Sequence, residues 1–350
     1  MKVDFLKPQI TESDIQRMAD SIRTGWLVRG GYTHIFEQEL SAYMRRRGLV
    51  TSSCTSSLHM ALVLLGVKKG DEVITTPISW VATSNVILYQ GAKVVFADID
   101  PRTGILDIRD VKRKITPKTK AIILVHLYGQ MADMKAFSKL GVPVIEDAAH
   151  ALEAERDGVK PGELGFAACL SFHAAKNLTS GQGGAIITKD TEKCELLVRD
   201  GVRNVNDKRM MIDFGYKYDL TDFQAALLIG QLRRIKSSHA KRVEVYKRYE
   251  DGFAGKLDFP DRIGTHACHM FSILVDPAKR DGIRKQLGEA GIQTSIHYTP
   301  IHQEPYYRKR YKVSLPAAEK FGASQITLPT YQLAKAQQKY VIRKVLESAG

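Results

Sequence analysis

The chain has 350 residues, of which 44% are hydrophobic and 26% charged, a composition typical of a soluble globular protein with a substantial core. No apolar run approaches the roughly 20 residues that span a bilayer, and the N-terminus lacks the apolar core of a signal peptide. We therefore expect a cytoplasmic protein that does not bind membranes.

Lysine and arginine total 52 against 38 aspartate and glutamate, which gives a net charge of +14. The basic residues are spread along the chain, and no helix-turn-helix, zinc or RNA-binding signature accompanies them. This distribution favours a small anionic metabolite over nucleic acid as the partner. The four cysteines have no metal-ligand spacing, so we expect reduced thiols and no metal site.

In chain order, the first expected element is a helix that begins at Thr11 and carries Ile15, Met18 and Ile22 on one stripe. Short, nearly continuous apolar runs then alternate with helical patterns between residues 55 and 190. Runs of this kind predict parallel strands buried on both faces, in an α/β sheet with helices on both sides. The strands are expected at 72–76, 93–99, 121–127, 143–149, 169–174 and 184–189, with helices at 56–67 and 80–90.

The pattern changes after a long helical region expected at 221–255. Beyond it we predict a strand at 269–276, a helix at 279–291, a strand at 293–300 and a final helix at 334–350. We therefore divide the chain into a large α/β domain of residues 1–250, with a mostly parallel central sheet, and a smaller C-terminal α+β domain of residues 251–350.

Four segments with chemical potential follow strand ends, and such ends line one crevice in a parallel sheet. The first, "SSCTSSLH" at 52–59, enters a helix, so its backbone N–H groups and the hydroxyls of Thr55 and Ser56 would hold a phosphate. An ordinary helix N-cap is the favoured alternative when this segment is taken alone.

The next two segments hold an aromatic residue and a carboxylate. Trp80 is one of only two tryptophans, and it would stack on a flat ring or fill the core. The pair Glu146–Asp147 ends a strongly apolar run, where a carboxylate needs a cationic partner such as a protonated pyridine nitrogen or a salt bridge.

The fourth segment, "SFHAAKNLTSGQGGAI" at 171–186, places Lys176 between an apolar strand and a glycine-rich turn. An amine near a phosphate site, an aromatic plate and a buried carboxylate can form a Schiff base with an aldehyde cofactor. The segment "GQGGA" is no dinucleotide fingerprint, so a dehydrogenase has little support.

These motifs resemble the DegT/DnrJ/EryC1/StrS group of sugar-nucleotide aminotransferases that use pyridoxal 5'-phosphate, and the resemblance runs almost end to end. It implies the three-layer fold of type I pyridoxal phosphate-dependent transferases. "EDAAHA" and "SFHAAKN" are the most specific of the matching stretches. The others include "GWLVRGGYTHIFEQEL", "GDEVITTPISWVATSN", "GAKVVFADID", "GYKYDLTDFQAAL" and "HYTPIHQEPYY".

The resemblance also implies residue roles. Lys176 would form the Schiff base and move the proton, and its presence favours transamination, because related dehydratases carry histidine there. Asp147 would keep the pyridine nitrogen protonated, and Trp80 would stack on the ring. His150 would lie beside the ring hydroxyl. The residues implied to hold the cofactor phosphate are Thr55, Ser56 and Ser171.

The chain departs from the group in "GYKYDL", where many relatives carry an asparagine that reaches the cofactor phosphate of the neighbouring subunit. Lys217 and Asp219 stand at the corresponding positions. Lys217 would neutralise a phosphate, whereas Asp219 would repel one. Arg29, His297, Tyr298, His302 and Tyr307 are the residues expected to contact the substrate, although a structural role is equally plausible for the histidines and tyrosines.

The resemblance implies amino transfer from L-glutamate to a keto carbon, most simply C4, of a nucleotide-linked 4-keto-6-deoxy sugar, by a homodimer with active sites at its interface. A transaminase acting at C3 or on a keto-cyclitol is the nearest alternative. A non-catalytic sensor with the same fold, or a nucleic-acid binder, represents a different class. The sequence names neither the nucleotide nor the pathway.

Overall fold

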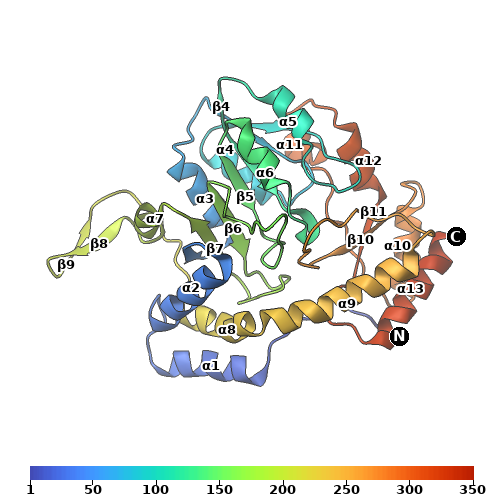
Figure 1. The fold of residues 1–350 in the computed structure, drawn as a ribbon, viewed down its shortest axis with the longest axis horizontal. Coiled ribbons are helices and arrows are strands. Elements are labelled where there is room, and N and C mark those ends of the chain that lie inside the picture. The colour runs from blue at the N-terminus through green and yellow to red at the C-terminus, as the bar shows by residue number, and fades with distance from the viewer.

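A seven-stranded sheet forms the centre of the molecule (Figure 1). The computed structural model describes all 350 residues. The strand order is β1-β7-β6-β5-β4-β2-β3, in which β3, β2, β4, β5 and β6 are parallel and β7 is antiparallel to both neighbours. The strands are β1 (Gly48–Thr51), β2 (Glu72–Thr75), β3 (Lys93–Phe96), β4 (Thr119–Val125), β5 (Val144–Asp147), β6 (Ala167–Ser171) and β7 (Gly184–Thr188). The predicted α/β class with a mostly parallel sheet is confirmed.

Helices lie on both sides of this sheet, which explains why its strands are apolar on both faces (Figure 1). β5, β7 and most of β4 are buried along their length, within a cluster of 64 buried hydrophobic residues. Six strands match the expected runs. β1 was not expected, because its apolar run consists of Leu49 and Val50 alone. The helices of this part are α1 (Glu12–Arg23), α2 (Gly31–Met44), α3 (Cys54–Leu64), α4 (Ala82–Tyr89), α5 (Ile108–Lys114), α6 (Met134–Phe137), α7 (Thr191–Val198) and α8 (Asp222–Arg233).

Helix α1 begins after Thr11 as expected, but it packs through a different face. Ile15 and Ile22 are exposed, whereas Asp14 and Ser21 are fully buried. Asp14 forms an ion pair with Arg234, at the end of α8. Ile15 and Ile22 of the expected stripe therefore lie on the exposed side of α1, and the side that carries Asp14 and Ser21 is buried.

The long helical region is interrupted near Arg234, so that α8 is followed by a separate helix, α9 (Ile235–Phe253). α9 runs from the sheet to a second cluster of 16 buried hydrophobic residues, which draws on Val3, on Val245 to Phe253 and on the C-terminal part of the chain. The domain boundary near residue 250 stays a prediction. The remaining helices are α10 (Arg280–Glu289), α11 (Pro305–Arg308), α12 (Pro316–Ser324) and α13 (Lys335–Ala349).

The strand predicted at 269–276 is present as β10 (Phe271–Leu274), but its partner is β11 (Gln325–Leu328). The strand predicted at 293–300 is wrong. Only Ser295 of that segment pairs with the sheet, through two backbone hydrogen bonds with Thr327. The segment instead turns away to line a pocket, which the β-rich residues of "QTSIHY" do not reveal.

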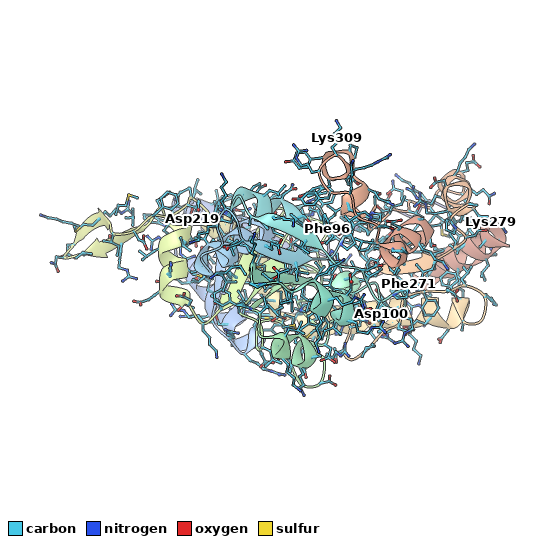
Figure 2. All side chains as sticks on the ribbon, turned by 90° about the horizontal axis from the view of Figure 1, so that it is seen from above. Phe96, Asp100, Asp219, Phe271, Lys279 and Lys309 are labelled. Carbon is cyan, nitrogen blue, oxygen red and sulfur yellow. The ribbon has the colours of Figure 1, made fainter.

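A β-hairpin of β8 (Val202–Val205) and β9 (Lys208–Met211) projects from the body of the molecule (Figures 1 and 2). Its two turn residues, Asn206 and Asp207, both have positive φ, as the tight hairpin turn requires. The exposed apolar side chains at and beyond its second strand are Met210, Met211, Ile212 and Phe214. No helix of the structure has the length and apolar character needed to cross a membrane.

Candidate active site

The first part of the site is the start of α3, directly after β1. Ser53 is the N-cap, and its hydroxyl accepts a hydrogen bond from the backbone N–H of Ser56 at 3.1 Å. Gly184 of β7 lies so close that a Cβ there would stand 2.4 Å from the backbone carbon of Ser53. Glycine at this position therefore lets β7 pack directly against the helix start. Ser56 donates to the Ser53 carbonyl, so it serves the cap, whereas the Thr55 hydroxyl takes no part in it.

Asp147 ends β5 and is 5% exposed. Its Oδ2 accepts a hydrogen bond from the Thr83 hydroxyl at 2.8 Å, and its Oδ1 accepts one from the Ala149 N–H at 3.3 Å. Burial raises the pKa of this carboxyl, and these two hydrogen bonds only partly oppose the shift. No cationic side chain pairs with Asp147, so the carboxylate is suited to a cation that enters the site.

Lys176 lies in the connection between β6 and β7, and its backbone N–H bonds to the His173 carbonyl at 2.9 Å. Its amine has no hydrogen bond or ion pair within the chain. Desolvation lowers the pKa of Lys176 to about 8, with Cys54 and Asp147 opposing the shift. An amine with this pKa is neutral in a substantial fraction of molecules near physiological pH, which makes it a nucleophile and a proton carrier.

His150 and Trp80 both lie near Tyr298, a residue of the C-terminal part of the chain. His150 Nδ1 accepts from the Tyr128 N–H at 3.2 Å, so its other nitrogen, Nε2, donates to the Tyr298 hydroxyl at 3.2 Å. Burial holds the pKa of His150 well below its ordinary value, and the ring is neutral. Trp80 is 64% exposed, and its ring centroid lies 6.4 Å from that of Tyr298, so it offers a free aromatic face.

These residues fit pyridoxal phosphate. An unpaired amine would link to the aldehyde, and a buried carboxylate without a cation would pair with the ring nitrogen. The exposed indole would cover the ring, and the α3 N-terminus would take the phosphate. Ser171, the last residue of β6, is partly buried, and its hydroxyl accepts a hydrogen bond from the His173 N–H at 3.4 Å.

Of the expected substrate residues, the structure brings His297 to the wall of the Lys176 pocket and Tyr298 to His150. The other three are occupied by structural contacts. Arg29 pairs with Glu37 at 2.6 Å, His302 with Glu319 at 3.1 Å, and the Tyr307 hydroxyl with Asn85 at 2.7 Å.

Lys217 is exposed, and it pairs with Asp219 at 3.1 Å within the same chain (Asp219 is labelled in Figure 2). Within one chain it lies outside the Lys176 pocket. Its expected contact with a cofactor phosphate across a subunit interface stays a prediction.

The structure also adds polar residues that sequence reasoning missed. Thr83 holds Asp147, and Asn177, His269 and Arg242 line the same pocket as Lys176. Asn177 directly follows Lys176, and this adjacency is the one local signal that pointed to any of the four.

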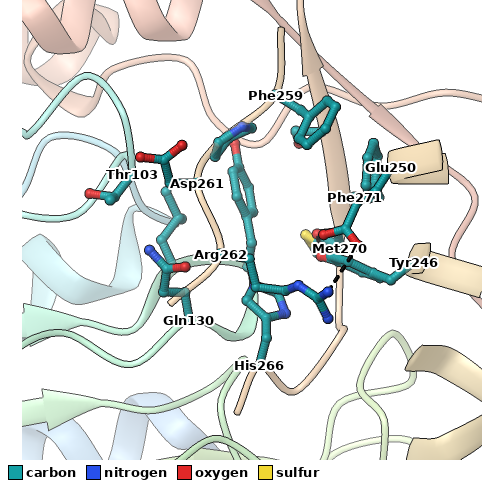
Figure 3. Close-up of a pocket in the computed structure, with 14 residues that line it drawn as sticks. Thr103, Gln130, Tyr246, Glu250, Phe259, Asp261, Arg262, His266, Met270 and Phe271 are labelled. Carbon is teal, nitrogen blue, oxygen red and sulfur yellow. Dashed lines mark hydrogen bonds and ion pairs between the residues drawn. The ribbon is translucent and has the colours of Figure 1, made fainter. Parts of the chain in front are cut away.

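A separate cavity of about 20 Å³, large enough for about one water molecule, lies between Gln130, Tyr246 and the ion pair of Arg262 with Glu250 (Figure 3). It does not include Lys176.

The fold and this site define a pyridoxal phosphate-dependent aminotransferase. The family model described as the DegT/DnrJ/EryC1/StrS aminotransferase family matches residues 8–346. The chain belongs to this family.

Individual relatives agree with this assignment. The chain is 34% identical over 353 residues to the spore coat polysaccharide biosynthesis protein SpsC of Bacillus subtilis, covering 93% of this chain and 91% of SpsC. Helicobacter pylori PseC, an aminotransferase involved in the biosynthesis of pseudoaminic acid, is 27% identical with a TM-score of 0.94, covering 100% and 99% of the two chains. Spr1654 of Streptococcus pneumoniae, solved in a PLP form, is 28% identical with a TM-score of 0.94, covering 100% and 99%.

Proposed function

We propose that the protein transfers an amino group from L-glutamate to C4 of a nucleotide-linked 4-keto-6-deoxy sugar, for the synthesis of an amino sugar of a surface polysaccharide. The observation that carries the amino transfer is the unpaired Lys176 amine beside the buried Asp147 carboxylate. The sugar pathway is supported by the similarity to SpsC and PseC, whose names place them in polysaccharide and pseudoaminic acid biosynthesis. The nucleotide is supported by the net charge of +14.

Bound pyridoxal phosphate supplies an aldehyde that links to amines and a ring that stabilises negative charge at the carbon next to the nitrogen. The side chains of the protein do the rest. Lys176 would take a proton from the carbon on one side of that nitrogen and return it to the carbon on the other side, a transfer that its lowered pKa allows. Asp147, whose carboxylate accepts a hydrogen bond from Thr83, would hold the proton on the ring nitrogen, and Trp80 would cover the ring.

We further propose that the active form is a homodimer. Exposed apolar side chains gather near α1 and at the projecting hairpin, including Ile15, Trp26, Val28, Met211 and Phe214. Exposed apolar clusters of this kind are typical of surfaces that a partner covers. A dimer would also bring Lys217 of one subunit toward the site of another, where its charge would meet the cofactor phosphate.

Borohydride reduction of the holoprotein followed by peptide mapping tests the chemistry, and we expect the pyridoxyl label on Lys176. A label elsewhere, or none under saturating cofactor, would contradict the proposal. The substrate is tested by incubating holoprotein and L-glutamate with UDP-, GDP- and dTDP-linked 4-keto sugars, with 3-keto sugars and with a keto-cyclitol, while 2-oxoglutarate is measured. Turnover only with 3-keto sugars, or only with a keto-cyclitol, would contradict amination at C4 of a sugar and favour that alternative substrate.

A further inference from the structure

The pocket beside Lys176 contains two polar atoms without partners. This pocket has a volume of about 80 Å³ and is formed by Lys176, Asn177, Arg242 and His269 together with two chain segments, 5–9 and 330–332. Arg242 is 6% exposed and His269 is 7% exposed. The Nε of Arg242 and the Nε2 of His269 have no hydrogen-bond partner. Buried polar atoms are almost always paired, so two orphans in one pocket indicate a ligand that satisfies them.

Arg242 is a hydrogen-bond donor that a buried glutamate holds in place. Its guanidinium forms an ion pair with Glu153, which is equally buried. The Nε–H of Arg242 is left over. None of the residues that line the pocket is acidic, whereas Lys7 and Lys176 add positive charge. The unmet need of Arg242 is therefore an anionic acceptor, and a guanidinium is well matched to a carboxylate.

His269 is an acceptor, and the hydrogen bonds around Asn177 show why. The Asn177 Nδ2 donates to both oxygens of Glu153 at 3.2 Å and to the Ala267 carbonyl at 3.0 Å. These partners only accept, so the amide orientation is fixed and its oxygen faces His269 Nδ1 at 3.2 Å. His269 Nδ1 must then carry the hydrogen.

Burial and the nearby Lys176 hold the pKa of His269 well below its ordinary value, so its ring is neutral. A neutral ring with hydrogen on Nδ1 has a lone pair on Nε2. The pocket thus contains an unmet donor, on Arg242, and an unmet acceptor, on His269. This combination complements a small zwitterion.

We propose that this pocket binds the zwitterionic head of an amino-acid donor, with Arg242 donating to its carboxylate and His269 Nε2 accepting from its ammonium group. Glu153 and Asn177 are positioning residues, because they orient the guanidinium and fix the tautomer of the imidazole. A pocket of about 80 Å³ holds several water molecules, room that suits the head of an amino acid but not a nucleotide-linked sugar. This inference rests on the proposed function in requiring an amino-acid donor.

The test uses two probes on the holoenzyme. L-Glutamate reports the donor half-reaction through the absorbance of the bound cofactor in a single turnover. 2-Methyl-L-glutamate has no hydrogen on its α-carbon, so its spectral titration reports binding without turnover. We expect Arg242→Gln to weaken 2-methylglutamate binding roughly 100-fold, since it removes a charged donor, and His269→Asn roughly 10-fold, since it removes a neutral acceptor.

Two further variants protect the test against misfolding. Arg242→Gln alone leaves Glu153 buried without its partner, so the double variant Arg242→Gln with Glu153→Gln removes both charges together. It should fold and bind cofactor but still bind 2-methylglutamate weakly. Lys241→Gln, which removes an exposed charge next to Arg242, should match the wild type.

The second half-reaction, in which the keto sugar accepts the amino group, separates a binding role from a structural one. When the pyridoxamine form reacts with the keto sugar, Arg242→Gln and His269→Asn should each lose less than in the donor half-reaction, because no donor head is present. Unchanged affinity for 2-methylglutamate in both folded variants would overturn the donor pocket alone. A wild-type holoenzyme that reacts with no L-amino acid would overturn the proposed function and the donor pocket together.

Discussion

Two neighbouring carboxylates on β5 are treated in opposite ways by the structure. Glu146 is fully buried on one face of the strand, where it accepts hydrogen bonds from His126 at 2.7 Å, from the Gly162 N–H at 2.9 Å and from the Gly165 N–H at 3.0 Å. Asp147 points to the other face and meets only hydroxyl, thiol and one backbone N–H, with its pKa raised by burial. Successive strand residues face opposite sides, so adjacency in sequence separates the two in space.

The difference shows how a structural carboxylate can be told from a functional one. Glu146 is surrounded so closely that a Cβ on Gly165 would stand 2.3 Å from its Oε1. Its partners leave no place for a ligand. The surroundings of Asp147 are incomplete without a cation, and Lys176 on the same side has no partner at all. Completeness of hydrogen bonding marks the structural face, and incompleteness marks the site.

Among substitutions in the site, Lys176→Ala should have the largest effect, because it removes the amine that moves the proton. Turnover should fall by roughly 10⁴-fold or more, because general acid–base and nucleophilic roles are lost together. Thermal stability should stay near that of the wild type, since the amine has no partner. Steady-state kinetics and thermal unfolding check this, and retained turnover would show that another amine does the chemistry.

Asp147→Asn should be the next largest change and should act on the chemistry rather than the fold. Replacing a buried unpaired carboxylate by an amide removes a desolvated charge, so the apo protein should be as stable or more stable. Turnover should fall about 10³-fold, the scale of one lost electrostatic contact to a reacting group. Loss of folding with little loss of turnover would show that Asp147, like Glu146, has a structural role.

Glu146→Gln should give the opposite result. The amide N–H₂ would face a donor where the carboxylate accepts, so one buried hydrogen bond is lost at about 1–3 kcal/mol. The free energy of unfolding should fall by that amount in a denaturant titration, while kcat of the folded fraction stays within about threefold. A large drop in kcat at wild-type stability would assign Glu146 to the site.

The smallest effect concerns the pH dependence of stability and His297, which lines the Lys176 pocket. Desolvation lowers the pKa of His297 from 6.5 to about 4, so the unfolded chain binds the proton more tightly than the folded one. The contribution of neutral His297 to the stability of the folded state is complete above pH 6.5 and is lost as pH falls toward 4. His297→Gln should reduce the loss of stability between pH 6.5 and 5.5 by about 1 kcal/mol. An identical pH dependence in the two proteins would contradict this.

Local patterns in the sequence predicted the central sheet and the residues carried on its strand ends. The buried strands are continuous apolar runs. Asp147 ends one of these strands, and Lys176 lies in the connection that follows another. The β8–β9 hairpin was missed because its strands are exposed and "KRMM" does not alternate. The strand expected at 293–300 failed because tertiary contacts, rather than β propensity, decide where that segment runs.

The polar network behind Lys176 was beyond sequence reasoning for a different reason. Asn177 and Glu153 are 24 residues apart, and Arg242 and His269 lie 89 and 92 residues from their partners. Hydrogen bonds over such separations leave no periodicity or spacing to detect. His302 and Tyr307 show the converse, since their residue types drew attention while the fold uses them to tie α12 and α4 into place.

Residues 5–9 form one wall of the Lys176 pocket, and few bonds secure the stretch ahead of them: Val3 with Gly291 and Gln293, and the Phe5 N–H with the Gln293 side chain. The ring of Phe5 stacks on His297 at 5.6 Å. A shift of Val3 or Phe5 relative to Gly291 and Gln293 would therefore reach the wall of the Lys176 pocket through the ring of His297.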